Sequence, residues 1–146
     1  DRLIEKYDIP KNMIETEITE TVENAGDSEV IKRLKERGYM LLMDDFGSGY
    51  SSLNMLKSTP FDVIKIDRDF FSEFMLSDRG KKIISHTISM SKDIGLDMVA
   101  EGVETKEQAE FLKNCGCDVA QGFYYSKPVP INDFERLGYD DWIATD

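Results

Sequence analysis

The sequence predicts an α/β fold with a parallel β-sheet, because short apolar runs alternate with segments of helical periodicity. Most of these runs end in polar residues, and a helical pattern follows. With right-handed crossovers all strand ends point the same way, so polar residues far apart in the chain meet at one edge. The runs expected to be strands are Met13 to Ile18, Tyr39 to Met43, Val63 to Ile66, Leu96 to Ala100 and Cys117 to Ala120.

The intervening helices are predicted from apolar spacing and from residues that start or stop helices. Two segments, Thr105 with Gln108 and Asn132 with Glu135, have the spacing of a capping box. The expected helices run from Asp27-Ser28 to Gly38, from Ser51 or Ser52 to before Pro60, from about Arg79 to Ile94, from Thr105 to Cys115, and onward from Asn132. We find no internal repeat beyond the strand–helix period.

Two adjacent carboxylates, Asp44 and Asp45, follow the apolar run that ends at Met43. Neighbouring negative charges at the edge of an apolar core repel each other and lose water, so they need a cation between them or a shared proton. A divalent metal would meet that need. A simple turn is the alternative, because Asp and Gly are common turn residues.

The composition excludes several classes of partner. The net charge is −11, and no basic patch is present to hold the backbone of a nucleic acid. No stretch approaches the ~20 apolar residues of a membrane span. Cys115 and Cys117 are expected to be free thiols, which fits a reducing cytoplasm.

The chain is short for a closed barrel. Eight strand–helix units need about 250 residues, whereas this sequence has 146. We therefore interpret residues 1–146 as a fragment of one domain, with an open sheet edge that would pair with another copy or with an upstream segment.

Five motifs occur in order along the chain. They are Glu17-Ile18-Thr19-Glu20, Asp44-Asp45-Phe46-Gly47-Ser48-Gly49-Tyr50-Ser51-Ser52-Leu53, Lys65-Ile66-Asp67-Arg68, Glu101-Gly102-Val103-Glu104-Thr105 and Gln121-Gly122-Phe123, with Pro128 beyond. In order and spacing these motifs resemble the EAL-domain cyclic-di-GMP phosphodiesterases. The resemblance covers about residues 13 to 137 and implies the C-terminal part of a TIM-like (β/α)8 barrel, about five strand–helix units of a partial EAL domain. The family's Glu-Ala-Leu signature and its Asn-bearing strand, which supply metal ligands, are not in this sequence.

The resemblance also implies roles for individual residues. Lys65 matches the lysine that holds the attacking water and the phosphate region, Glu101 matches the catalytic base, and Asp45 is grouped with them as catalytic. The implied ligands of two Mg²⁺ or Mn²⁺ ions are Glu17, Asp44, Asp45 and Glu101. Gln121, Glu104 and Pro128 match substrate-binding or water-orienting positions. Glu20 matches the residue that anchors the loop carrying the two aspartates.

The implied activity is metal-dependent hydrolysis of cyclic-di-GMP to linear pGpG in bacterial signalling, by a cytoplasmic protein or a cytoplasmic domain of a larger one. Two divalent ions would supply a nucleophile near neutral pH and neutralise the phosphoryl oxygens. The 146 residues alone are expected to be inactive, because two ligand-bearing segments lie upstream in the family. The alternative is a receptor that binds cyclic-di-GMP, or a protein partner, without hydrolysis; such domains usually lose metal ligands that are present here.

Other interpretations are weaker or remain open. A one-metal barrel enzyme of the enolase type could use Asp44, Lys65 and Glu101, but the adjacent aspartates and the Glu-x-Thr-Glu motif favour the phosphodiesterase. Lys65 could instead extend its ammonium to solvent, and Glu104 could simply favour the start of a helix. Asp67 is expected to be structural, and His86 receives no role.

Overall fold

The computed structural model describes residues 2–19, 25–47 and 52–136. Its centre is a five-stranded sheet in which every neighbouring pair is parallel and the strands follow chain order. The strands are β1 (Glu15–Thr19), β2 (Met40–Phe46), β3 (Val63–Ile66), β4 (Asp97–Ala100) and β5 (Val119–Ala120). The predicted alternation of parallel strands and helices is therefore confirmed.

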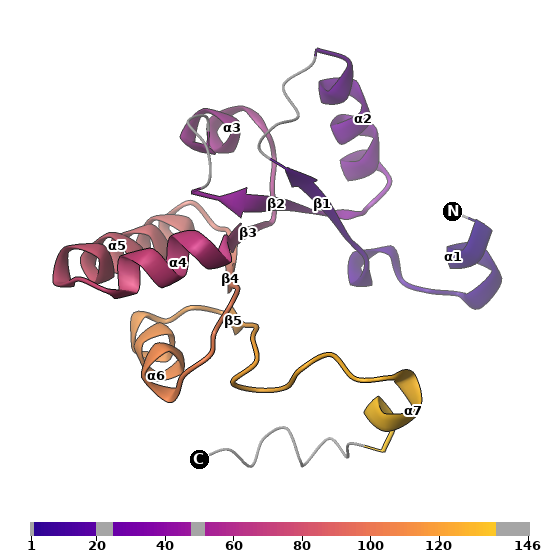
Figure 1. Cartoon of the computed structure of the whole chain (residues 1–146). Coiled ribbons are helices and arrows are strands. Elements are labelled where there is room, and N and C mark those ends of the chain that lie inside the picture. The colour runs from indigo at the N-terminus through magenta and orange to yellow at the C-terminus, as the bar shows by residue number, and fades with distance from the viewer. Residues whose placement is uncertain (1, 20–24, 48–51, 137–146) are drawn as a thin grey trace.

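The helices follow one another around the row of strands (Figure 1). They are α1 (Arg2–Tyr7), the 3-10 turn η1 (Lys11–Met13), α2 (Ala25–Glu36), α3 (Ser52–Ser58), α4 (Arg68–Met75), α5 (Asp78–Asp93), α6 (Lys106–Cys115) and α7 (Ile131–Phe134). No helix in the described ranges is both long and apolar enough to cross a lipid bilayer.

The main core lies between the sheet and helices α2 to α6. Phe71 of α4 and Ile84 and Ile88 of α5 are completely buried against strand residues such as Leu41 and Ile64. Each such side chain contributes roughly 1.5–3 kcal/mol by leaving water. Packing of the helices against one face of the sheet therefore fixes which strand residues point to the other face.

The opposite face carries a smaller apolar cluster followed by polar residues. Leu42, Val63 and Val99 form this cluster. Side chains on one strand face recur every second residue. The residues two positions further along are Asp44, Lys65 and Glu101. The fold thus places the candidate site directly beyond a buried apolar layer.

The second strand differs from the prediction. It continues to Phe46, so Asp44 and Asp45 lie within β2 and not after it. Its register with β3 shifts between Met43 and Phe46, and Asp45 has a φ of 57°. Phe46 is buried in the main core, which explains why the strand continues past two carboxylates.

Helix α4 was not predicted. Asp67 caps it by accepting hydrogen bonds from the N–H groups of Asp69 and Phe70, each at 2.9 Å. Phe71 and Phe74 then follow at helical spacing. The structural role expected for Asp67 is confirmed.

Of the two predicted capping boxes, one is confirmed and one is wrong. Thr105 and Gln108 form the predicted capping box of α6, and Gly116 ends that helix with a φ of 77°. Asn132 does not cap α7, because the helix starts at Ile131 after Pro130 and has no side-chain cap. Cys115 and Cys117 are free thiols, as predicted.

Candidate active site

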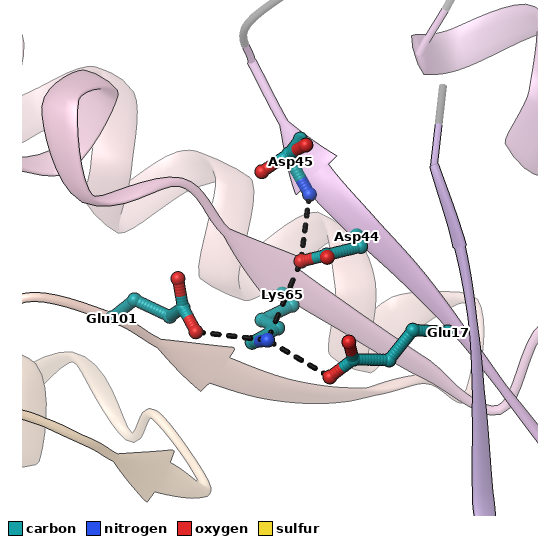
Figure 2. Close-up of polar contacts among 5 residues, drawn as sticks. All are labelled: Glu17, Asp44, Asp45, Lys65 and Glu101. Carbon is teal, nitrogen blue, oxygen red and sulfur yellow. Dashed lines mark hydrogen bonds and ion pairs between the residues drawn. The ribbon is translucent and has the colours of Figure 1, made fainter. Parts of the chain in front are cut away.

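Lys65 lies at the centre of the predicted carboxylate group (Figure 2). Its neighbours Ile64 and Ile66 are completely buried on the helix side, so Lys65 points to the other face of β3. The Lys65 Nζ lies 2.9 Å from Glu17 Oε1, 2.8 Å from Glu101 Oε1 and 3.5 Å from Asp44 Oδ1. Four residues from four parts of the chain therefore meet at one edge of the sheet.

The environment of Lys65 keeps it charged. Its side chain is only 13% exposed, against 51% for Glu17. Burial alone would lower the pKa of the Lys65 ammonium, but hydrogen bonds to Glu101 and Glu17 and the negative charge of Asp44 raise it above its ordinary value. The solvent-extended interpretation of Lys65 is therefore wrong: the ammonium neutralises carboxylates.

Asp45 occupies a different place from Asp44. Its backbone N–H donates a 3.0 Å hydrogen bond to Asp44 Oδ1, while its carboxylate points away from Lys65 (Figure 2). Burial, followed by the charges of Asp44, Asp67 and Glu101, raises the pKa of the Asp45 carboxyl, although Lys65 opposes the shift. Asp45 therefore shares the negative field of the site without contacting its central cation.

A hollow of about 180 Å³ lies beside Glu101. Glu104 and Gln121, two of the predicted rim residues, line it together with Arg68 and Gly102. A Cβ atom at Gly102, which has a φ of +70°, would lie 2.2 Å from Arg68 Cγ. Sequence reasoning gave Arg68 no role, although its place in the Lys-Ile-Asp-Arg motif was a usable signal.

Glu104 also makes a contact outside this hollow, and Pro128 lies apart from it. Glu104 donates its backbone N–H to Gln108 Oε1 at 2.7 Å and so belongs to the start of α6. Pro128 is exposed in the segment between β5 and α7 and is not among the residues that line the hollow. Glu20 and residues 48–51 lie outside the described residues.

The side chains present suit a hard divalent cation. Carboxylate oxygens are the ligands that Mg²⁺ and Mn²⁺ prefer, and the negative charge of this group exceeds what one ammonium can neutralise. Among the described residues, no three acidic, thiol or imidazole side chains are arranged as a preformed metal site. Lys65 instead stands among Glu17, Asp44 and Glu101. The donor set fits a metal in its chemistry.

Comparison with known proteins identifies the family of the chain. The model of the EAL domain family matches residues 1–128. The chain is 38% identical over 135 residues to the cyclic di-GMP phosphodiesterase RocR of Pseudomonas aeruginosa, covering 90% of this chain and 34% of RocR. Homologues of this kind are named cyclic di-GMP phosphodiesterases.

Solved structures show the same fold. The EAL domain of Mycobacterium smegmatis DcpA matches with a TM-score of 0.84 and 37% identity, over 93% of this chain and 62% of that one. A manganese and cyclic-di-GMP complex of Klebsiella pneumoniae BlrP1 matches with a TM-score of 0.79 and 32% identity, over 86% of this chain and 33% of that one. The chain thus spans less than two thirds of each of these relatives.

The fold and the site define a TIM-barrel-like α/β domain with a lysine-centred group of carboxylates at the carboxyl edge of its strands. Within the residues that the structure describes, the barrel fold is represented by a five-stranded sheet. The chain belongs to the EAL-domain family.

Proposed function

We propose that this chain carries part of the active site of a phosphodiesterase that opens one phosphodiester of cyclic-di-GMP and gives linear pGpG. The observation that carries the proposal is the contact of the Lys65 ammonium with Glu17, Asp44 and Glu101 at one sheet edge. The name of RocR and the ligands of the BlrP1 complex support the choice of substrate.

Two divalent cations, Mg²⁺ or Mn²⁺, would be held by Glu17, Asp44, Asp45 and Glu101. When bound, they supply a nucleophile near neutral pH and neutralise charge on the phosphoryl group. The manganese in the BlrP1 complex supports this assignment. The raised pKa of Asp45 reflects burial and crowding by other carboxylates, which a bound cation would relieve.

Two residues of the chain, Lys65 and Glu101, would act on the attacking water and the phosphoryl group. Lys65 donates hydrogen bonds toward a phosphoryl oxygen or the attacking water, in a partly dry site where such bonds are strong. Glu101, 2.8 Å from Lys65, accepts the proton of that water.

The substrate would extend from this centre into the hollow beside Glu101. Gln121 and Glu104 line it and would orient the ligand or a water molecule. Pro128 is proposed to contact the nucleotide further out. Glu20 would support the loop that carries the aspartates.

A second candidate function is a receptor that binds cyclic-di-GMP without hydrolysing it. It is favoured by one observation: Lys65 stands where a cation would bridge Glu17, Asp44 and Glu101. An ammonium in that position can bind a phosphate without catalysing its hydrolysis.

Three further points belong to the same proposal. The 146-residue chain by itself is inactive, and its outer strands pair with another copy or an upstream segment; β1 and β5 end the sheet in the described residues. Light scattering at high concentration that gives only a monomer would contradict self-association. A cytoplasmic location is also proposed.

The experiment that tests the function compares this chain with a version extended upstream by about 100 residues to reach the size of a barrel. Each is incubated with cyclic-di-GMP and Mg²⁺ or Mn²⁺, and both nucleotide binding and pGpG formation are measured. The proposal is supported if the extended version forms pGpG and the 146-residue chain does not. Binding without product in both would favour the receptor.

A further inference from the structure

Asp62 holds the start of β2 and the start of β3 together. Its side-chain Oδ2 accepts a 2.8 Å hydrogen bond from the N–H of Leu41, and its own N–H donates to the Leu41 carbonyl oxygen at 2.9 Å. Lys35, at the end of α2, pairs with Asp62 Oδ1. One aspartate thus engages both polar groups of the Leu41 backbone.

Asp118 makes the equivalent contact between β4 and β5. Its Oδ2 accepts a 2.9 Å hydrogen bond from the N–H of Met98, and its Oδ1 lies 3.7 Å from the Nζ of Lys92 at the end of α5. In both cases the aspartate precedes the first residue of a strand and binds the second residue of the previous strand.

Two sets of residues repeat with a spacing of three within each part, and the gap between the parts differs by one residue. The first set is Lys35, Gly38, Leu41 and Asp44, followed by Asp62 and Lys65; the second set is Lys92, Gly95, Met98 and Glu101, followed by Asp118 and Gln121. Both glycines have positive φ, 86° and 78°, and both donate their N–H to the carbonyl of the lysine three residues before. The sequence pattern shows no internal repeat beyond the strand–helix period, whereas the structure contains two strand–helix–strand units with the same contacts.

These hydrogen bonds are needed where they occur. Leu41 and Met98 are completely buried, and a buried N–H without an acceptor is costly. Each aspartate lies one residue before the next strand begins. Its carboxylate therefore accepts the hydrogen bond from the N–H of Leu41 or Met98. The contacts also fix register, and a slip of one residue would turn every side chain to the other face.

We propose that Asp62 and Asp118 are positioning residues for the edge of the sheet that carries the site. Each aspartate fixes the register of one strand pair and lies three residues before a side chain of the site. Asp62 places Lys65 beside Asp44, and Asp118 places Gln121 beside Glu101. Calling that edge catalytic rests on the proposed function, whereas the fixing of register does not.

The test uses the 146-residue chain and two NMR signals. Amide hydrogen exchange at Leu41 reports the hydrogen bond, and the side-chain Cε–Nζ signal of Lys65 reports its contacts with carboxylates. In Asp62→Ala, the Leu41 amide should exchange at least about tenfold faster and the Lys65 signal should move, with Met98 unchanged. In Asp118→Ala, the Met98 amide should respond while Leu41 does not.

Two further variants separate positioning from general stability. Asp62→Asn keeps an oxygen that can accept from Leu41 and should keep both signals near those of the unsubstituted chain, even if Asp62→Ala does not fold. Asp97→Ala is the matched control, because Asp97 also starts a strand and its side chain has no hydrogen bond to the described part of the chain. It should change neither signal.

The proposal is overturned if Asp62→Ala lowers thermal stability but leaves the Lys65 signal in place, or if Leu41 exchange does not change. Loss of Leu41 protection in Asp62→Asn as large as in Asp62→Ala would also contradict it. These readouts need no substrate, so they stand even if no version of the protein hydrolyses cyclic-di-GMP. If hydrolysis occurs in the extended version, Asp62→Ala should lower kcat and leave KM nearly unchanged.

Discussion

Lys65 offsets the mutual repulsion of three carboxylates, those of Glu17, Asp44 and Glu101. Its ammonium contacts Glu101 and Glu17 within 2.9 Å, and the Lys65 side chain is only 13% exposed, so the attraction is less screened than that of a surface pair. One positive charge among several carboxylates still leaves an excess of negative charge. That excess is the reason to expect a divalent cation at this place.

Replacing Lys65 by Met should therefore destabilise the fold. Removal of the cation leaves Glu17, Asp44 and Glu101 close together without their common partner. We expect a loss of about 1–2 kcal/mol in EDTA, below the 3–5 kcal/mol of a fully buried pair because Glu17 is half exposed. Urea denaturation measures the change.

The matched control is Lys81→Met, which removes a lysine from one exposed pair with Glu107 at 3.0 Å. It should cost less than about 0.5 kcal/mol. Mg²⁺ should restore part of the stability of Lys65→Met, because a divalent cation can replace the ammonium. A Lys65→Met chain as stable as the unsubstituted one in EDTA would show that the carboxylates do not need Lys65.

Cys117 gives a prediction about pH. Burial raises the pKa of its thiol to about 11, from the ordinary value of 9.0. At pH 8 the thiolate fraction is then about a hundredfold lower than for an unperturbed thiol. In a Cys115→Ser chain, alkylation by iodoacetamide should be slow at pH 8 and should accelerate until about pH 11, as followed by mass spectrometry.

The same shift affects stability. The folded chain holds the Cys117 proton more tightly than the unfolded chain does, so the stability of the fold should fall as pH rises from about 9 toward 11. An alkylation profile with its midpoint near pH 9 would mean that burial does not protect this thiol.

At the scale of elements, α6 depends on its first residues. The Thr105 side chain accepts from the Gln108 N–H at 3.3 Å, and Gln108 Oε1 accepts from the Thr105 N–H at 3.0 Å. Thr105→Ala should cost about 1 kcal/mol in thermal or chemical unfolding. In Thr87→Ala, by contrast, only a hydroxyl bonded back to Ile83 within α5 is lost, so the effect should stay within about 0.5 kcal/mol. Equal losses from the two variants would argue against the capping box.

The turn after β5 depends on a glycine for a different reason. A Cβ at Gly122 would lie 2.1 Å from the backbone oxygen of Val103, which cannot move aside easily. Gly122→Ala should cost about 3 kcal/mol. Gly38→Ala is the comparison: it has a φ of +86° but no atom within 4 Å of a Cβ, so about 1 kcal/mol is expected. A smaller loss at Gly122 than at Gly38 would contradict the close packing of this turn.

Local signals explain which elements could be predicted from the sequence. The capping box at Thr105 and the glycine at Gly116 act over three or four residues, so the pattern contains all the information. Helix α4 was missed because its cap, Asp67, was considered only as the end of a strand motif. The break in β2 depends on the burial of Phe46, which no local pattern reports.

At the scale of the molecule, topology predicted the site better than local pattern did. Parallel strands bring Glu17, Asp44, Lys65 and Glu101 to one edge. The strand–helix order predicted this for Asp44, Lys65 and Glu101, whereas only the resemblance of its motif singled out Glu17. The sequence could not predict that the Lys65 ammonium would contact three carboxylates. That result depends on strand register, which tertiary contacts such as that of Asp62 determine.

The proposed function requires that a phosphodiester is opened at this edge of the sheet. The most direct measurement is pGpG formation by the extended version in Mg²⁺ or Mn²⁺, with Asp44→Asn compared with Glu15→Gln. Glu15 is also an acidic residue of β1 and lies two positions before Glu17. We predict a loss of about a hundredfold or more for Asp44→Asn and no more than about a twofold change for Glu15→Gln. Hydrolysis by Asp44→Asn at the unsubstituted rate would contradict the proposed function.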